Sequence, residues 1–233
     1  MSGLRQGLCW LPVFLVAWSA SNFIIPYIIA VCRHDVSVIF PYISTAGATP
    51  PESCIFGLMA VITACAALAT MYARYKFMER LLEETSRVSP RLNSASLLLG
   101  MCSCLGMCVV GSFPESTVLV VHDIGAFLFF VSGVGYILLQ TVMGCQLAPY
   151  RSSLCWIRSS LVAVAILALV SAIICGSLQR PTDPSRDPTP QSDPLHVASA
   201  ACEWILAFSF VCFFLTFINE FKLFSLLVRV EYM

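Results

Sequence analysis

The sequence predicts an all-α membrane protein, a bundle of six transmembrane helices with both termini in the cytoplasm. Three observations lead to this prediction. Of the 233 residues, 58% are hydrophobic and only 11% are charged, whereas a soluble domain carries about a quarter charged residues. Six apolar stretches are long enough to cross a bilayer. Basic residues are concentrated in every second connection. The mean hydropathy of +0.85 agrees with a membrane location.

A transmembrane helix needs about 20 mainly apolar residues. Stretches of that length lie at residues 8–31, 54–73, 94–113, 118–143, 158–178 and 197–219. Together they occupy more than half of the chain, which leaves no room for a separate globular domain of ~50 residues or more. We therefore expect residues 1–233 to form a single six-span domain. The first stretch exceeds the ~7–15 apolar residues of a signal peptide, so we expect an uncleaved helix, with a cleaved signal peptide as the alternative.

The distribution of basic residues predicts the orientation. Six spans place both termini on one side of the membrane. That side carries ten Lys and Arg residues: Arg5, Arg74, Lys76, Arg80, Arg87, Arg91, Arg151, Arg158, Lys222 and Arg229. The other side carries three: Arg33, Arg180 and Arg186. Because cytoplasmic loops carry the excess of Lys and Arg, we expect both termini in the cytoplasm and the loops 32–53, 114–117 and 179–196 in the lumen or outside.

The connections and one span carry further local signals. Residues 75–84 mix both charges with helix formers, which predicts that the second span continues as a helix, with Pro90 near the start of the next one. The 179–196 loop holds five of the 13 prolines among Asp, Ser and Thr, a composition typical of a flexible loop. Pro26 lies inside the first span, removes a backbone donor and predicts a kink.

We expect most of the 12 cysteines to act as packing residues. No histidine or carboxylate accompanies the cysteines of the 94–113 span, so we predict no metal site there. Cys32 and Cys54 bracket the first lumenal loop, where an oxidising compartment would allow a disulfide, and they form a candidate pair. Cys145 and Cys155 lie in a cytoplasmic connection, where palmitoylation is open to them.

Two acidic residues, Asp123 and Glu203, lie inside predicted spans. Ionisable residues within a membrane are functional candidates by default. Both lie within about two turns of the lumenal end, where a carboxylate that pairs or caps is the alternative. We expect Glu203 to accept hydrogen bonds from the proline-stiffened 32–53 loop, and the indole N–H of Trp204 to reach polar groups at the same interface.

Common enzyme signatures do not occur in the sequence, which has no Gly-x-Ser-x-Gly, no His-Glu-x-x-His and no phosphate-binding glycine-rich loop. The 13 basic and 13 acidic residues leave no basic surplus for nucleic acid. The sequence therefore predicts a non-enzymatic protein without a cofactor, in contact with membrane lipids and other membrane proteins. The alternative is a transporter or lipid-handling protein with Asp123 and Glu203 on a polar path.

Several segments together resemble a known family. The first lumenal loop contains Phe40-Pro-Tyr-Ile-Ser and Pro50-Pro-Glu-Ser, and the sixth span opens with Ala201-Cys-Glu-Trp. In combination these resemble the damage-regulated autophagy modulators, or DRAM family, within the wider group of Frag-type and Sfk-type six-span proteins. The motif positions of the family fall on Pro41, Tyr42, Ile43, Ser44, Pro50, Pro51, Glu52, Glu203 and Trp204.

The resemblance implies a function that composition does not. It implies a lysosomal membrane protein that promotes autophagy and links tumour-suppressor stress signalling to apoptosis, with autophagy proteins or other membrane proteins as partners. Relatives of the Sfk type are linked to phosphoinositide kinases and lipid asymmetry, which keeps a lipid-handling role as the alternative. The segment Tyr75-Lys-Phe-Met fits a Tyr-x-x-bulky sorting pattern and would serve a lysosomal location.

Overall fold

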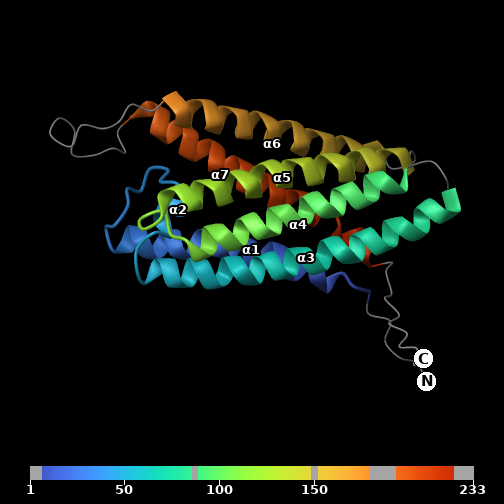
Figure 1. Ribbon diagram of the computed structural model, residues 1–233, viewed down its shortest axis with the longest axis horizontal. Helices are drawn as coiled ribbons and strands as arrows, with labels where there is room; N and C mark the ends of the chain where they lie inside the picture. Colours follow the sequence, from blue (N-terminus) through green and yellow to red (C-terminus); the bar gives the residue numbers. More distant parts are fainter. Residues whose placement is uncertain (1–6, 86–88, 148–151, 179–192, 223–233) are drawn as a thin grey trace, which may run out of the picture.

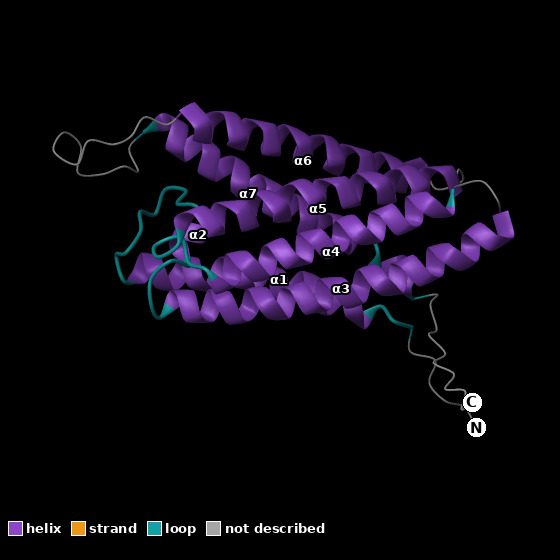
Figure 2. Cartoon of the chain, in the orientation of Figure 1, coloured by secondary structure: helices purple, strands orange, loops and turns teal. Residues whose placement is uncertain are grey.

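The computed structural model describes residues 7–85, 89–147, 152–178 and 193–222. They form one bundle of long helices with two short helices at its ends, and no strand occurs among them (Figure 1; Figure 2). The long helices are α1 (Trp10–Cys32), α3 (Glu52–Thr85), α4 (Pro90–Ser112), α5 (Leu119–Leu147), α6 (Ser152–Leu178) and α7 (Pro194–Leu215). The short ones are α2 (Ile43–Ala46) and α8 (Ile218–Phe221).

The prediction of an all-α protein with six spans is confirmed, because six helices are long and apolar enough to cross a membrane. Helices suit this environment because they satisfy their backbone polar groups internally. The predicted extension of the second span is also present, since α3 runs on to Thr85. Pro90 is the first residue of α4, as expected. Residues 179–192 of the predicted flexible loop lie outside the described residues.

Consecutive helices pack side by side, as short connections favour. α4 lies between α3 and α5, α1 packs on α3 and α7, and α6 packs on α7 and α5. α2 contacts α1 and α7 at one end of the bundle, which we call the α2 end, and α8 contacts α1 at the other, the α8 end (Figure 1). The start of α1 and the end of the last described helix therefore share one end.

Small residues allow α4 to lie close to both of its neighbours. A Cβ on Gly106 would lie 2.7 Å from the carbonyl oxygen of Gly125 and 2.8 Å from the Cα of Phe129, both on α5. On the side of α3, a Cβ on Gly111 would lie 2.8 Å from the Cβ of Ala60. Close backbone approach of this kind is the usual role of small residues in membrane helices.

The structure corrects the predicted disulfide. Cys32 and Cys54 are both free and exposed. The bridge joins Cys145 of α5 to Cys155 of α6 instead, across a Cα–Cα distance of 5.4 Å. The ends of α1 and α3 near these cysteines are linked instead by an ion pair between Arg33 and Glu52.

We expect Gly106→Ala to destabilise the protein, because its methyl group would overlap the backbone of α5. Gly176→Ala is the matched control, since a Cβ there meets only the hydroxyl of Ser199 at 3.5 Å. In a helix without a clash, Ala is favoured over Gly by about 1 kcal/mol. Thermal unfolding in detergent should therefore show a lower Tm for Gly106→Ala and an unchanged or higher Tm for Gly176→Ala. Equal Tm values for the two variants would contradict this packing.

Candidate functional site

The family motif positions gather at the α2 end of the bundle. Glu203, partly buried on α7, accepts a hydrogen bond from the backbone N–H of Ile43 at 3.0 Å. Ile43 is the first residue of α2, and the first amides of a helix have no partner within it. A carboxylate also suits the positive end of a helix. The expectation that Glu203 accepts a hydrogen bond from the first loop is confirmed.

Trp204 strengthens the same attachment. Its indole N–H donates to the carbonyl oxygen of Pro41 at 2.8 Å, as expected for an interfacial tryptophan. Its ring meets that of Tyr27 edge-on at 5.6 Å, and the hydroxyl of Tyr27 donates to the carbonyl of Val38 at 2.9 Å. The ring of Tyr42 packs against that of His196, 4.8 Å away. These contacts tie the loop before α2 to α1 and α7.

The connection between α4 and α5 holds the other side of α2. The hydroxyl of Thr45 donates to Glu115 at 3.1 Å, and that of Ser116 donates to the carbonyl of Ala48 at 2.6 Å. His122 lies 2.8 Å from the carbonyl of Phe113 through Nδ1. Because a carbonyl oxygen only accepts, Nδ1 carries the proton of this bond. α2 is therefore held from both sides.

Glu52 occupies the motif position at the start of α3. Its side chain is fully buried, and one of its oxygens lies 3.1 Å from Nε of Arg33. The same Nε donates to Asp35 at 3.1 Å, and the oxygens of Glu52 accept no hydrogen bond from the described residues. Glu52 thus balances the charge of Arg33 and lies in the first turn of its helix, where a negative charge is favourable.

Asp123 does not join Glu203. Asp123 is exposed on α5, whereas its neighbour His122 is buried. Glu203 and His122 both line a small cavity under α2 that Asp123 does not line. The two acids singled out from the sequence therefore do not share a polar path among the described residues.

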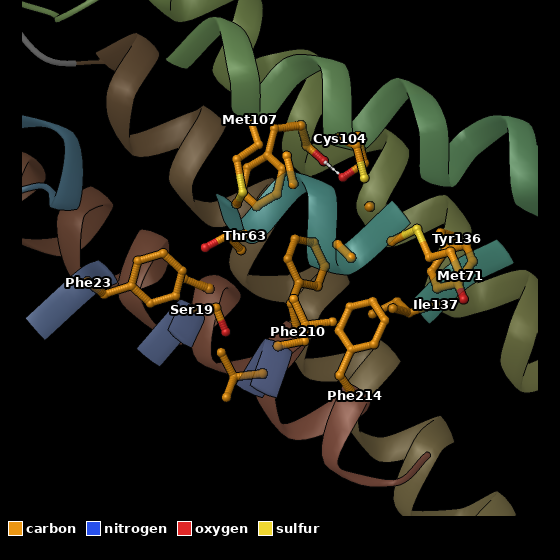
Figure 3. Close-up of a pocket in the computed structure, with 18 residues that line it drawn as sticks. Ser19, Phe23, Thr63, Met71, Cys104, Met107, Tyr136, Ile137, Phe210 and Phe214 are labelled. Atoms are coloured by element: carbon orange, nitrogen blue, oxygen red, sulfur yellow. Dashed lines mark hydrogen bonds between the residues drawn. The ribbon is translucent and has the colours of Figure 1, made fainter. Parts of the chain in front are cut away.

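Two small cavities lie between helices of the described part of the chain. The larger has a volume of about 50 Å³ and is lined mainly by apolar side chains, such as Phe23, Met107 and Phe210 (Figure 3). The smaller, of about 30 Å³, lies nearer to α2 and shares Phe23 and Met107 with the larger. Asn22 lines the smaller cavity. Asn22 is not among the residues expected from the sequence to form a site, although its place four residues before Pro26 is a signal.

A second polar cluster, also missed from the sequence, closes the α8 end. Glu220 of α8 lies 2.7 Å from a guanidinium nitrogen of Arg74 and 3.0 Å from one of Arg158. Both arginine side chains are only 3% exposed. Nε of Arg74 donates to Gln140 at 3.2 Å, and Gln140 donates to Ser96 at 2.9 Å. This arginine cluster joins α3, α4, α5, α6 and α8.

The sorting pattern Tyr75-Lys-Phe-Met lies within α3. Its bulky residue, Met78, is 1% exposed and packs with Leu82 and Met143. Tyr75 is partly buried and its hydroxyl donates to Glu79 at 3.3 Å. Because the bulky residue is inside the bundle, the pattern is not an accessible peptide and gives no support to a lysosomal location.

Comparison with known proteins identifies the family of the chain. Residues 7–224 match the family model described as the Frag1/DRAM/Sfk1/Cwh43P N-terminal domain. The chain is 43% identical to DNA damage-regulated autophagy modulator protein 1 of Mus musculus, over 97% of this chain and 96% of that protein. It is 38% identical to modulator protein 2 of Mus musculus, over 97% and 88%.

A more distant relative, the modulator of macroautophagy TMEM150B of Danio rerio, is 30% identical over 91% of this chain and 84% of that protein. No solved structure matches the chain. The family model covers nearly all of the chain, and the modulator proteins are similar along almost their whole length. The chain therefore belongs to the Frag1/DRAM/Sfk1 family, as a member of the DNA damage-regulated autophagy modulators.

Proposed function

We propose that this protein is a non-enzymatic regulator of autophagy in the lysosomal membrane, which links stress signalling to autophagy and apoptosis by binding other membrane proteins. The names of its relatives support the coarser statement that it is an autophagy-modulating, multi-pass membrane protein. The finer statements, on the lysosome and on a role as an adaptor, are our own extension of that similarity.

The observation that carries the adaptor role is the interior of the bundle. Pockets that hold small-molecule substrates have volumes of about 300–1,000 Å³, whereas the two small cavities between the helices have about 50 and 30 Å³. The hydroxyl groups of Ser19, Thr63 and Ser103 in the larger cavity donate to backbone carbonyls. Polar contacts hold both ends together. A transporter needs a continuous polar route, so this interior favours a protein that acts through its outer surfaces.

We also propose that both termini face the cytosol, on the asymmetry of ten basic residues against three. The disulfide between Cys145 and Cys155 joins α5 to α6 on the side that this asymmetry assigns to the cytosol, although cytosolic thiols are usually reduced. The bond and the basic residues thus favour opposite orientations. An accessibility experiment decides between them.

We expect an epitope tag placed within residues 182–193 to be hidden from antibody when only the plasma membrane is permeabilised, and a C-terminal tag to be accessible. Full permeabilisation with a second detergent is the control, since both tags should then be stained. Staining of the 182–193 tag from the cytosol would reverse the orientation and would place the disulfide in the lumen.

A second candidate function, lipid handling, is favoured by one feature of the outer surface. An open groove of about 650 Å³ lies between α6 and α7, lined by apolar side chains such as Ile157 and Leu215 and by polar ones at Ser153, Thr216 and Asn219. A groove with apolar and polar walls near the end of two spans fits a lipid with its headgroup at the polar part. It fits a helix of a partner protein equally well, so a substitution in the groove can distinguish the adaptor role from lipid handling.

We expect Ile157→Trp, which fills this groove, to change the set of proteins labelled by a proximity enzyme fused to the C-terminus and to lower autophagic flux. Ile174→Trp is the matched control, because both isoleucines lie on α6 with 52% exposure and Ile174 does not line the groove. Imaging of both variants against organelle markers tests the lysosomal location. If Ile157→Trp changes lysosomal lipid content and leaves the labelled proteins unchanged, lipid handling replaces the adaptor role.

We expect Glu203→Ala to lower the amount of folded protein and autophagic flux together, because the amide of Ile43 would lose its acceptor at a cost of about 1–3 kcal/mol. Glu203→Gln retains a carbonyl oxygen for that amide and should reduce both quantities less. The measurements are the protein level by immunoblot and the flux by turnover of an autophagosome marker. Two variants of normal abundance and equally low flux would contradict a structural role for this carboxylate.

A further inference from the structure

The disulfide between Cys145 and Cys155 joins the end of α5 to the start of α6 at the α8 end of the bundle. Cys155 lies three residues before Arg158, which pairs with Glu220 of α8. Both cysteines are partly buried, so neither is sealed inside the bundle. The other ten cysteines are free. The bond is therefore the one disulfide that the described residues form, and it is open to small reagents.

This position is unusual for a structural disulfide. The asymmetry of basic residues assigns the α8 end to the cytosol, where glutathione and thioredoxin keep thiols reduced. Disulfides that do form in the cytosol are mostly transient and serve as catalytic or redox-sensing groups. The basic residues and the bond thus agree with each other if the bond is reversible.

The geometry lets the two cysteines pair without a rearrangement of the helices. Their Cα–Cα distance of 5.4 Å lies inside the range of about 4.4–6.8 Å that disulfides span. The two residues are ten positions apart, and a cross-link that closes a short loop restricts the unfolded chain less than one that closes a long loop. Reduction of the bond is therefore compatible with a folded bundle, in which α6 still packs on α7 and α5.

The bond lies beside the groove of about 650 Å³ between α6 and α7. Leu154 and Ile157 line the α6 wall of that groove, and they lie one residue before and two residues after Cys155. The same segment of α6 is attached to α7 by Arg158, whose Nε donates to the hydroxyl of Thr216 at 2.9 Å. The wall is thus linked to α7 by a hydrogen bond and to α5 by the disulfide. Of these two links, the disulfide is the one that reduction removes.

We propose that Cys145 and Cys155 are a reversible oxidation site, closed by hydrogen peroxide and opened by cytosolic thiols, which controls the α6 wall of the groove. In the oxidised state the wall is fixed to both neighbouring helices. In the reduced state α6 loses its covalent link to α5, and the segment with Leu154 and Ile157 is free to shift. This role rests on the orientation proposed above, with both termini in the cytosol.

The oxidation proceeds in two steps that use one molecule of peroxide. The thiolate of one cysteine attacks an oxygen of the peroxide and breaks the O–O bond, which gives a sulfenic acid and hydroxide. The hydroxide takes up the proton that the thiol has lost and becomes water. The second thiol then displaces water from the sulfenic sulfur and forms the disulfide. In the reverse direction, two molecules of glutathione reduce the bond by thiol–disulfide exchange and leave as oxidised glutathione.

Redox trapping of the full chain in cells tests the oxidation site. Free thiols are blocked with N-ethylmaleimide in denaturant at lysis, and the thiols that a reductant then releases are labelled with maleimide-polyethylene glycol. The disulfide appears as a gel shift of two labels, because the ten free cysteines are blocked in the first step. After a pulse of hydrogen peroxide, the ratio of disulfide to dithiol should rise about tenfold, the response to a ~30 mV change in thiol poise. It should fall back once the peroxide is removed.

Two variants relate the bond to the groove. Cys145→Ser cannot form the bond, and Cys32→Ser is the matched control, because Cys32 is free and exposed. A biotin ligase fused to the C-terminus should label a different set of proteins after the peroxide pulse in the wild type and in Cys32→Ser. The set should stay unchanged in Cys145→Ser. Thermal unfolding in detergent with a reductant should give the same Tm for Cys145→Ser and the wild type, which excludes a folding defect.

Three outcomes would overturn this role. The first is a cysteine pair that stays reduced after the peroxide pulse while the C-terminal tag is accessible from the cytosol, so that the orientation stands without the oxidation site. The second is a bond that neither peroxide nor a permeant reductant changes, which marks a structural disulfide; a C-terminal tag hidden from the cytosol would then overturn the orientation as well. The third is a peroxide-dependent change in labelled proteins that Cys145→Ser retains, which places the response elsewhere.

Discussion

The hydrogen bond from the first amide of α2 to the carboxylate of Glu203 is the contact on which the α2 end depends. The two residues lie 160 positions apart, and each presents a polar group at the edge of an apolar bundle. In such surroundings, water is scarce and an unpaired group is costly. This bond gives the amide of Ile43 an acceptor and the carboxylate of Glu203 a donor, and it attaches the 32–53 loop to α7. Trp204, Thr45 and Ser116 then hold the same loop through Pro41, Glu115 and Ala48.

At the α8 end, charged side chains rather than neutral groups hold the helices together. Arg74 and Arg158 share the single carboxylate of Glu220, and the ring centroid of Phe217 lies 5.0 and 4.9 Å from the carbon atoms of the two guanidinium groups. Cation–π contact with a buried ring stabilises the charge that the carboxylate leaves uncompensated. Removing one member of such a set lowers the free energy of unfolding by more than the intact pair contributes to it, because a buried charge is left without a partner. The bundle is thus fastened at both ends, and its core contains small residues such as Ala60 together with large apolar ones such as Phe213.

This construction bears on how the protein acts. The interior offers cavities of about 50 and 30 Å³, which are too small for a metabolite. Chemistry on a substrate or its passage would require the end contacts to open. The outer face of α6 and α7, with its groove of about 650 Å³, needs no such change. Contact with a partner or a lipid at the side of a stable bundle is the physically simpler mode of action.

The sequence by itself determined the elements and their order, because the length and hydropathy of a span are local properties. It also determined the continuation of α3 to Thr85, the start of α4 at Pro90, and the attachment of the first loop to Glu203. Only the tertiary structure decided which side of each helix faces inward. Membrane helices are apolar on all sides, so their pattern does not mark an inner face. For that reason, only the structure shows that Asp123 is exposed and that Asn22 is buried. Only the structure shows that Arg74 and Arg158 both pair with Glu220. It also shows that the disulfide joins Cys145 to Cys155, while Cys32 and Cys54 are free.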